Sequence, residues 1–199
     1  GYGVHWFRRD LRLVGNPALA KNLKKHSGRV LGVFCFDKTF LSRPDFSVPR
    51  FLFFLETLQK LADDLDSAGG ELLILDEPPQ IALLELHRQL SVSKLGAPRT
   101  WSWNRDYEPF ARARDETMIR LLGKDPEVEL LTERDHLLLE PHEILKDDQT
   151  AYQVYSPFKR RWLKAFASEE GVARLQEARA LHAAGRPRLS LRYPESLPL

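Results

Sequence analysis

The sequence predicts an α/β fold: a Rossmann-like, doubly wound sheet of five parallel strands in the order 3-2-1-4-5, followed by a carboxyl-terminal helix and linker. Two observations support this prediction. Five short segments are apolar throughout, which is typical of strands buried on both faces of a parallel sheet. Segments with helical spacing of apolar residues separate them and can supply the crossovers that parallel strands need. A chain of 199 residues, 43% of them hydrophobic, is long enough to bury such a core.

The first strand is predicted at residues 3–7, "GVHWF". Asn16 and Pro17 then predict the start of a helix, because an Asn side chain caps free backbone N–H groups and the fixed φ of proline suits a first helical turn. A second apolar strand, "RVLGVFCF", follows at residues 29–36.

Residues 48–68 form the clearest helical pattern, because apolar residues recur there at steps of three and four. Gly69 and Gly70 are typical of the end of a helix. The segment "ELLILD" at residues 71–76 predicts the third strand, and residues 80–90 predict the helix after it. The alternation of a strand and a helix then continues.

The last strand–helix–strand unit begins with "TWSW" at residues 100–103, the predicted fourth strand. A helix is expected at residues 110–122 and the fifth strand at residues 128–132. The alternation ends near residue 135, so the α/β core is expected to span residues 1–135.

Residues 136–199 are expected to form an extension with one further helix, which Pro157 can open. Aromatic side chains interleaved with basic ones in this helix could contact nucleic acid. The preferred interpretation is a helix with a basic solvated face and three aromatic residues packed inward, namely Phe158, Trp162 and Phe166. The tail after it is Pro-rich and has no regular period, which is typical of a linker.

The composition excludes several classes of protein. Lys and Arg total 30 against 28 for Asp and Glu, so the net charge of +2 is no argument for nucleic-acid binding. The single cysteine, Cys35, excludes an internal disulfide framework and fits a reducing compartment. We find no apolar run that could span a membrane, no signal-peptide layout and no histidine spacing typical of zinc ligands. We therefore expect a cytoplasmic, monomeric protein without a metal or a membrane partner.

Charged residues follow the first strand, where a dinucleotide-binding protein would have a glycine-rich turn. Arg8, Arg9 and Arg12 surround Asp10. The arginines can hold an anion through charge-assisted hydrogen bonds, or they can pair with Asp10 and pin the loop. The sequence leaves both alternatives open.

Two further stretches follow the second and fourth strands. Cys35 lies near the end of the second strand, where a cysteine is most often a small buried hydrophobic residue, and Phe34 lies on the opposite face. Asp106 and Glu108 are two residues apart, so their carboxylates point the same way in an extended segment. They can share the donors of one polar ligand, or one of them can have a raised pKa.

The predicted topology brings these stretches together. Ligands of doubly wound sheets bind outside the carboxyl ends of the strands, where the strand order reverses. The three stretches are the exits of strands 1, 2 and 4, which converge in the order 3-2-1-4-5. We therefore expect them to form a pocket rather than separate solvated loops.

Three motifs in these regions resemble segments of the DNA photolyase and cryptochrome family. "VHWFRRDLRLVGNPAL" resembles its amino-terminal signature, "WNRDYEPFARARD" the segment after its fourth strand, and "YQVYSPFKRRW" the segment that leads out of its first domain. The resemblance covers only that first, α/β domain, which binds a light-harvesting antenna chromophore. It implies that the catalytic FAD and the lesion pocket belong to a second, all-helical domain that these residues do not contain.

The resemblance also implies the type of antenna. Members that use methenyltetrahydrofolate have Asn-Glu shortly after the Tyr-Glu of this segment, where this sequence has Phe110 and Ala111. Members that bind 8-hydroxy-5-deazaflavin or FMN have an Asp-x-Glu-Pro pattern, which residues 106–109 match. By position, this implies a chromophore site whose carboxylates meet the polar edge of the ring, formed by Arg9, Phe34, Cys35, Arg50, Asp106 and Glu108.

The function that the resemblance implies is the antenna domain of a light-dependent DNA repair photolyase, a carbon–carbon lyase. Such a domain passes excitation energy to FAD, and damaged DNA is contacted through the helical domain. We expect this chain alone to be inactive, and we predict no catalytic residue in it. A cryptochrome photoreceptor domain and a free-standing flavodoxin-like protein that binds a flavin or nucleotide are the alternatives that the sequence leaves open.

Overall fold

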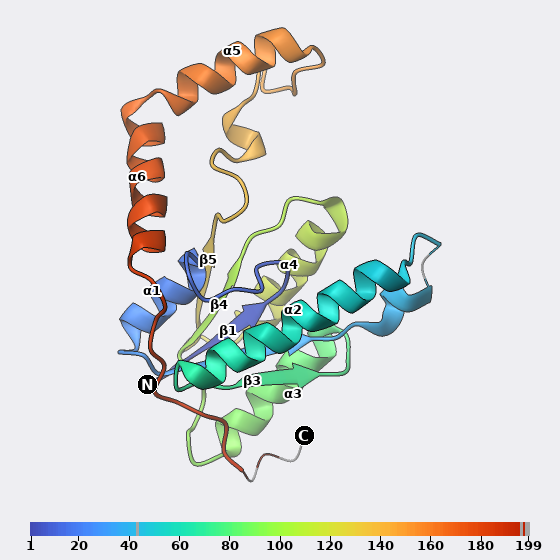
Figure 1. The fold of residues 1–199 in the computed structure, drawn as a ribbon, viewed down its shortest axis with the longest axis vertical. Coiled ribbons are helices and arrows are strands. Elements are labelled where there is room, and N and C mark those ends of the chain that lie inside the picture. The colour runs from blue at the N-terminus through green and yellow to red at the C-terminus, as the bar shows by residue number, and fades with distance from the viewer. Residues whose placement is uncertain (43, 196, 198–199) are drawn as a thin grey trace.

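Five parallel strands form one sheet in the order β3-β2-β1-β4-β5 in the computed structural model, which describes residues 1–42, 44–195 and 197 (Figure 1). Every pair of neighbouring strands is parallel. The predicted fold class and strand order are therefore confirmed. The strands are β1 (Gly3–Phe7), β2 (Val30–Cys35), β3 (Leu72–Leu75), β4 (Thr100–Asn104) and β5 (Glu129–Glu133).

Helices cover both faces of the sheet. Side chains of α1 and α2 pack with Phe7 and Phe34 on one face, and side chains of α3 and α4 pack with the tryptophans of β1 and β4 on the other. Two helices, α5 and α6, follow the last strand. The helices are α1 (Pro17–Lys25), α2 (Val48–Ser67), α3 (Pro79–Val92), α4 (Pro109–Leu122), α5 (Tyr155–Phe166) and α6 (Glu169–Ala183), with two short 3-10 segments at η1 (Lys38–Ser42) and η2 (Pro141–Glu143).

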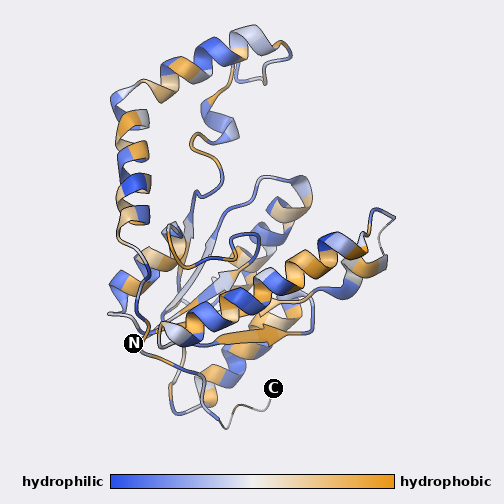
Figure 2. Cartoon of the chain, in the orientation of Figure 1, coloured by the Kyte–Doolittle hydropathy of each residue, from blue (hydrophilic) through white to orange (hydrophobic). Residues whose placement is uncertain are grey.

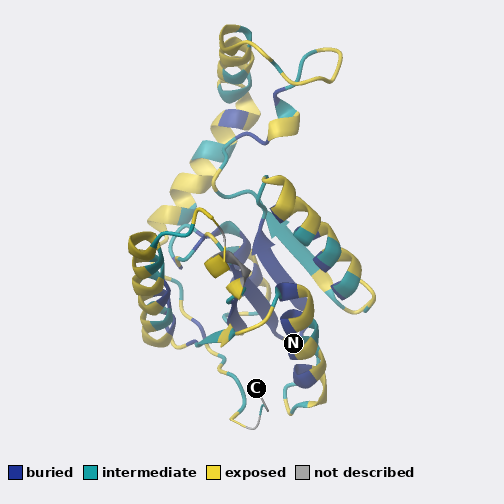
Figure 3. Cartoon of the chain, turned by 90° about the vertical axis from the view of Figure 1, so that its right-hand side faces the viewer, coloured by how far each residue is buried: buried dark blue, intermediate teal, exposed yellow. Residues whose placement is uncertain are grey.

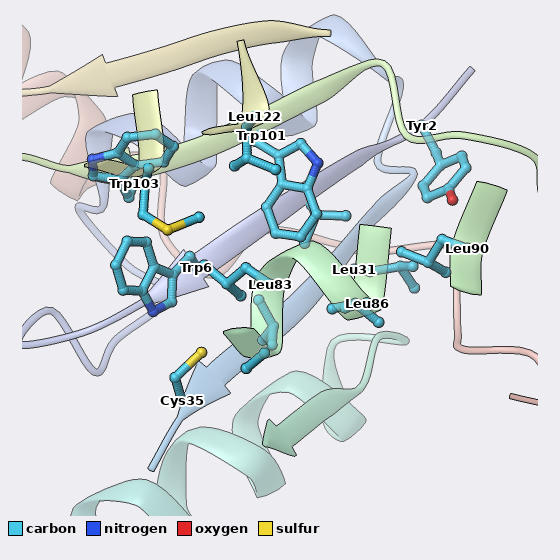
Figure 4. Close-up of a cluster of buried hydrophobic side chains, with 14 residues drawn as sticks. Tyr2, Trp6, Leu31, Cys35, Leu83, Leu86, Leu90, Trp101, Trp103 and Leu122 are labelled. Carbon is cyan, nitrogen blue, oxygen red and sulfur yellow. The ribbon is translucent and has the colours of Figure 1, made fainter. Parts of the chain in front are cut away.

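Three tryptophans form the centre of the larger core cluster (Figure 4). Trp101 and Trp103 alternate with Ser102 on β4, so both reach the face covered by α3 and α4. The rings of Trp6 and Trp103 meet edge to face with their centroids 5.9 Å apart. The three central strands are buried, whereas β3 and β5 at the edges are only partly covered (Figure 3).

The predicted beginning of α1 is confirmed in detail. The Asn16 side chain accepts a hydrogen bond of 3.1 Å from the Leu19 N–H, and Pro17 occupies the first helical position. Since Asn16 is fully buried, its amide must find further partners inside the protein. It donates to Asp10 at 3.0 Å, which joins α1 to the loop after β1.

The carboxyl-terminal extension contains two helices, so the prediction of one helix is wrong. Ser168 caps α6 by accepting a hydrogen bond from the Gly171 N–H. The apolar residues of α6 are scattered around the helix rather than gathered on one face, as Figure 2 shows. A pattern of this kind gives no periodic signal in the sequence.

Helix α5 stands away from the sheet and joins α6 (Figure 1). None of its residues is buried, so the expected inward packing of its aromatic side chains is wrong. Phe158 is exposed, and the rings of Trp162 and Phe166 stack on each other with centroids 5.2 Å apart. The helix is amphipathic as predicted, but its apolar face is only partly covered: Tyr152 contacts Phe158, and Trp162 and Phe166 are half-buried.

The Pro-rich tail has no regular structure, but it is docked on the α/β core. The Leu189 N–H donates to the Ala68 carbonyl oxygen at 2.8 Å, and the Tyr193 hydroxyl donates to the Gly32 carbonyl oxygen at 2.9 Å. Leu189 is buried among the residues of α2. Gly69 makes room for it at φ +90°, because a Cβ there would lie 2.6 Å from the Leu189 carbonyl oxygen. The tail therefore belongs to the core rather than to a free linker.

Replacing Leu189 with alanine should lower the free energy of unfolding by about 2 kcal/mol, because it removes a buried side chain from the junction of the tail and α2. Urea denaturation followed by circular dichroism measures the change. Leu163→Ala is the matched control, since Leu163 is exposed on α5 and its loss should change the free energy by less than about 0.5 kcal/mol. Equal effects of the two substitutions would contradict the docking of the tail.

Along the described residues, no helix combines the length and the apolar character that crossing a membrane requires.

Candidate functional site

A cavity of about 1030 Å³ opens at the carboxyl ends of β1 and β2. It lies between the first turns of α2 on one side and the first turns of α3 and α4 on the other. Its volume is at the upper end of the range for small-molecule sites, so it can take a ring system with an attached chain.

Phenylalanine side chains form one wall of this cavity. Phe51 and Phe54 lie one helical turn apart on α2, with ring centroids 6.3 Å apart and planes inclined by 21°. Phe34 at the end of β2 lies 5.6 Å from Phe54, and Phe46 lies 5.6 Å from Phe51. Such a run of flat apolar surfaces is suited to a planar conjugated ligand. The sequence pattern assigned Phe51 to the buried face of a helix, and only the fold shows that it lines a cavity.

Arginine side chains supply most of the charge at the cavity. Among the described residues that line it, the cations are Arg8, Arg9, Arg50 and Arg114, and the anions are Asp37 and Asp45. Arg50 donates a hydrogen bond to the backbone carbonyl oxygen of Asp45. The described lining is therefore more basic than acidic.

The structure brings four of the six expected site residues into the cavity wall, namely Arg9, Phe34, Cys35 and Arg50. Asp106 and Glu108 are not in that wall. Arg9 Nη1 lies 3.1 Å from Glu108 Oε1 and 3.4 Å from both carboxylate oxygens of Asp106. The two carboxylates thus contact Arg9 without lining the cavity, and Asp106 lines an adjoining hollow of about 230 Å³.

Asp106 does not have the raised pKa that one alternative required. Burial raises the pKa of Asp106, but hydrogen bonds from the Tyr107 N–H and the Arg9 side chain, together with the charge of Arg9, outweigh burial and place the pKa below its ordinary value. The other alternative, in which the two carboxylates share the donors of one polar ligand, stays a prediction, and in this structure both carboxylates contact Arg9.

The loop after β1 is held by partners far away in the sequence. Arg8 pairs with Asp115 and donates to the Asn104 carbonyl oxygen, and Arg12 pairs with Asp135. The side chain of Asp10 instead accepts hydrogen bonds from the Asn16 and Asn104 amides. The arginines therefore do not pair with the side chain of Asp10, although they pin the loop as one alternative expected.

The Arg8 side chain lies where β1 and β4 stop pairing at the carboxyl end of the sheet. The pairing of β1 with β4 ends at His5 and Ser102, whereas β1 stays paired with β2 as far as Phe7 and Phe34. Beyond Ser102, the carbonyl oxygen of Asn104 accepts from the Arg8 guanidinium. This opening between β1 and β4 is the switch point at which the strand order reverses.

The model of the DNA photolyase family matches residues 3–186, which is nearly the whole chain. The chain belongs to the DNA photolyase family. It is 34% identical over 159 residues to a deoxyribodipyrimidine photo-lyase of Synechococcus, a match that covers 80% of this chain and 31% of the relative. It is 30% identical over 135 residues to cryptochrome-2 of Gallus gallus, covering 68% of this chain and 22% of the relative.

Solved photolyase structures share the fold. The class III photolyase of Agrobacterium tumefaciens superposes with a TM-score of 0.73 at 26% identity, over 100% of this chain and 36% of that chain. The archaeal photolyase of Sulfolobus tokodaii superposes with a TM-score of 0.61 at 26% identity, over 71% of this chain and 31% of that chain. The latter structure contains two FAD molecules, from which a novel light-harvesting cofactor was inferred. The chain thus corresponds to the amino-terminal domain of the photolyases and spans about a third of their length.

Cys35 is a buried part of this photolyase domain, as its residue type suggested. It packs in the tryptophan cluster and reaches the cavity with one side (Figure 4). Burial raises the pKa of the Cys35 thiol to about 12, so it is a neutral group at physiological pH. No group of three or more metal-ligating side chains occurs within the described residues.

The residues that sequence reasoning missed are on helices. Phe54 on α2 and Arg114 on α4 both line the cavity, and neither was among the expected site residues. No signal in the sequence identifies them, because the side of a helix that meets a cavity has the same spacing as the side that meets a core.

Proposed function

We propose that this chain forms the antenna domain of a light-dependent DNA repair photolyase and binds a planar conjugated chromophore in the cavity. The observation that carries the proposal is the run of phenylalanine rings facing arginine side chains at the carboxyl end of the sheet. The bound chromophore would absorb light and pass its excitation energy to an FAD held by a second, helical domain. The related Sulfolobus photolyase, with its two FAD molecules, supports a flavin-type ligand.

The protein's own part in this function is to hold and orient the ring. Phe34, Phe51 and Phe54 would exclude water from the chromophore and fix the plane of its ring. Asp106 and Glu108 would act through Arg9, which they align at the edge of the cavity. No side chain forms or breaks a bond in this role, so we expect the chain alone to have no lyase activity.

The chromophore we propose is of the 8-hydroxy-5-deazaflavin or FMN type. The residues 106–109 have the Asp-x-Glu-Pro pattern, and Phe110 stands where folate-binding members have Asn. Phe110 also lines the cavity, so an apolar ring occupies a position at which a polar amide would meet a folate.

The partners that we propose are the FAD-binding helical domain and, through it, damaged DNA. Helix α5 leaves Tyr155, Phe158 and Leu163 exposed, which is a surface that a further domain could cover. We propose that residues 1–135 form the α/β unit and that residues 136–199 connect it to the helical domain, with the tail returning to the core.

Similarity to cryptochrome-2 favours a second candidate function, a domain of a light-signalling photoreceptor. The cavity would bind the same chromophore in both cases. Light-dependent repair of pyrimidine dimers by the protein carrying its FAD domain would support the photolyase, and a lack of repair with intact FAD would support the photoreceptor. We do not propose the free-standing flavodoxin-like carrier, because the chain belongs to the photolyase family.

Reconstitution with 8-hydroxy-5-deazaflavin, FMN and methenyltetrahydrofolate, each in turn, tests the chromophore. We expect one of the two flavin-type compounds to bind at least about tenfold more tightly than the folate, because residues 106–109 match the Asp-x-Glu-Pro pattern and Phe110 stands in the cavity wall where folate-binding members have Asn. Quenching of ligand fluorescence gives the affinity, and the bound ratio should be one per chain. Tightest binding of the folate, or failure of all three to bind, would overturn the proposal.

A further inference from the structure

Two arginine side chains lie close to one tryptophan ring at the cavity. The guanidinium carbons of Arg8 and Arg114 are 4.9 Å and 5.1 Å from the centroid of Trp6. Trp6 is buried among the tryptophans of the core (Figure 4), so its ring is held in place and both guanidinium groups pack against a fixed surface. Contacts of this kind are weakly attractive but do not neutralise a charge.

Among the described residues, Asp115 is the carboxylate that forms an ion pair with both arginines. Arg8 pairs with Asp115 Oδ1 and also donates to the Asn104 carbonyl oxygen. Arg114 Nε lies 3.6 Å from the same Asp115 oxygen, which is beyond hydrogen-bonding distance. The guanidinium of Arg8 therefore has hydrogen-bond acceptors, whereas the Nε of Arg114 has none within hydrogen-bonding distance among the described residues.

Arg114 has a buried donor without a partner. Its Nε makes no hydrogen bond, although the atom is shielded from solvent, and a buried donor in this state costs about 1–3 kcal/mol. Burial lowers the pKa of Arg114, and the neighbouring charge of Arg8 lowers it further. The guanidinium nevertheless stays protonated in water, so it remains a positive charge in need of a counter-charge.

The position of Arg114 points to where that counter-charge would come from. The side chain lines the cavity together with Arg9 and Arg50. Arg9 already contacts two carboxylates, whereas Arg114 forms, within the described part of the chain, one ion pair with a carboxylate, the one that it shares with Arg8. Asp106 acts on Arg114 only as a more distant charge. An anionic group on a ligand in the cavity would give Arg114 the charge-assisted hydrogen bond that the protein does not supply.

We propose that Arg114 recognises an anionic group on the planar ligand, so that the cavity selects a negatively charged chromophore over a neutral one of the same shape. This inference rests on the proposed function and specifies the ligand class further. The anion can be a phosphate on the side chain of the ligand or an ionised oxygen on its ring, and the chemistry of recognition is the same for both.

Two matched pairs of ligands test the inference and separate the two sources. FMN and riboflavin differ only in the phosphate, and 7,8-didemethyl-8-hydroxy-5-deazariboflavin and 7,8-didemethyl-5-deazariboflavin differ only in the ionisable ring oxygen. We expect the wild type to prefer the anionic member of at least one pair by about tenfold or more. Arg114→Gln should reduce this preference to about twofold or less, and Arg114→Lys should retain part of it because the charge remains.

Arg112→Gln is the control, because Arg112 is exposed on the same helix and does not line the cavity. It should leave the preference unchanged. Fluorescence titration at several salt concentrations gives the affinities, and thermal unfolding shows whether each variant is folded. A structural role of Arg114 on Trp6 alone would lower the stability and weaken both members of a pair equally.

The outcomes separate the inference from the proposed function. Equal binding of charged and neutral members, or a preference that persists in Arg114→Gln, overturns the inference and leaves the chromophore site intact. Failure of the wild type to bind any of the four compounds overturns both. A preference that is lost in Arg114→Gln and kept in Arg112→Gln supports both.

Discussion

Replacing Ala113 with tryptophan should reduce chromophore affinity at least about a hundredfold, a loss of about 3 kcal/mol or more in binding free energy. Ala113 lines the cavity from α4, between Phe110 and Thr117, and its small side chain leaves space for a ligand. An indole at this position would project into that space. The protein should stay folded, because Ala113 is exposed and the core beneath α4 is unchanged.

The matched control for this substitution is Glu116→Trp. Glu116 is exposed on α4 but does not line the cavity. The substitution therefore adds an indole of the same size on the same helix but outside the cavity. The affinity of the Glu116→Trp variant for the chromophore should stay within about twofold of that of the wild type. If Ala113→Trp binds as tightly as Glu116→Trp, the chromophore does not occupy this cavity, and the assignment of the site is wrong.

Replacing Asp10 with alanine should lower the free energy of unfolding by about 3 kcal/mol. The side chain is buried and accepts hydrogen bonds from the Arg8 N–H at 2.9 Å, the Asn16 amide at 3.0 Å and the Asn104 amide at 2.5 Å. Alanine would remove the acceptor of the Arg8 N–H and one of the acceptors of each amide, leaving Asn16 with the Arg12 carbonyl oxygen and Asn104 with the Asn16 side chain. For a domain of this size, the melting temperature should fall by roughly 6–12 °C.

The effect of Asp10 should also depend on pH. Burial raises the pKa of Asp10, but the nearby His5 imidazole and the hydrogen bonds from Arg8 and Asn104 outweigh burial and hold the pKa well below its ordinary value of 3.8. A carboxyl group whose pKa is lowered on folding stabilises the protein above its unfolded pKa and loses this contribution as the pH falls toward the folded pKa. The difference in stability between wild type and Asp10→Ala should therefore shrink between about pH 5 and pH 2.

Urea denaturation at several pH values measures this difference. Asp147→Ala serves as the control, because Asp147 is exposed and its removal should cost less than about 0.5 kcal/mol at every pH. A difference for Asp10→Ala that stays constant down to pH 2 would show that its carboxylate is not stabilised by the buried network.

The network around Asp10 also connects stability to the site. Asn104 donates to both Asp10 and Asn16 and accepts from the Ala18 N–H, so it joins the exit of β4 to the start of α1. Asp10 in turn fixes the loop that carries Arg8 and Arg9 to the cavity. A weaker network should therefore loosen the cavity wall as well as the fold.

The sequence by itself determined the elements of the α/β core and their order in the sheet. Strands that are apolar throughout fit only a sheet covered on both faces, and helical crossovers between them require parallel pairing. Asn16 and Pro17 marked the start of α1, and Gly69 and Gly70 the end of α2. These signals are local, and each follows from the conformational preferences of a few neighbouring residues. The motifs within them were sufficient to indicate the family.

Only the tertiary structure decided how the site is composed. Arg9 meets Asp106 and Glu108, and Arg8 meets Asp115, across about a hundred residues of chain, and no local pattern specifies such pairs. The same holds for the tail, whose Leu189 is buried only because α2 ends beside it. The sequence shows which kind of partner a charged or apolar side chain can contact. The actual partner depends on which elements the folded sheet places next to that side chain. For that reason, a cavity at the carboxyl end of the strands, with Arg9 and Arg50 in its wall, could be predicted, while the place of Arg114 and the pairing of Arg9 with the two carboxylates could not.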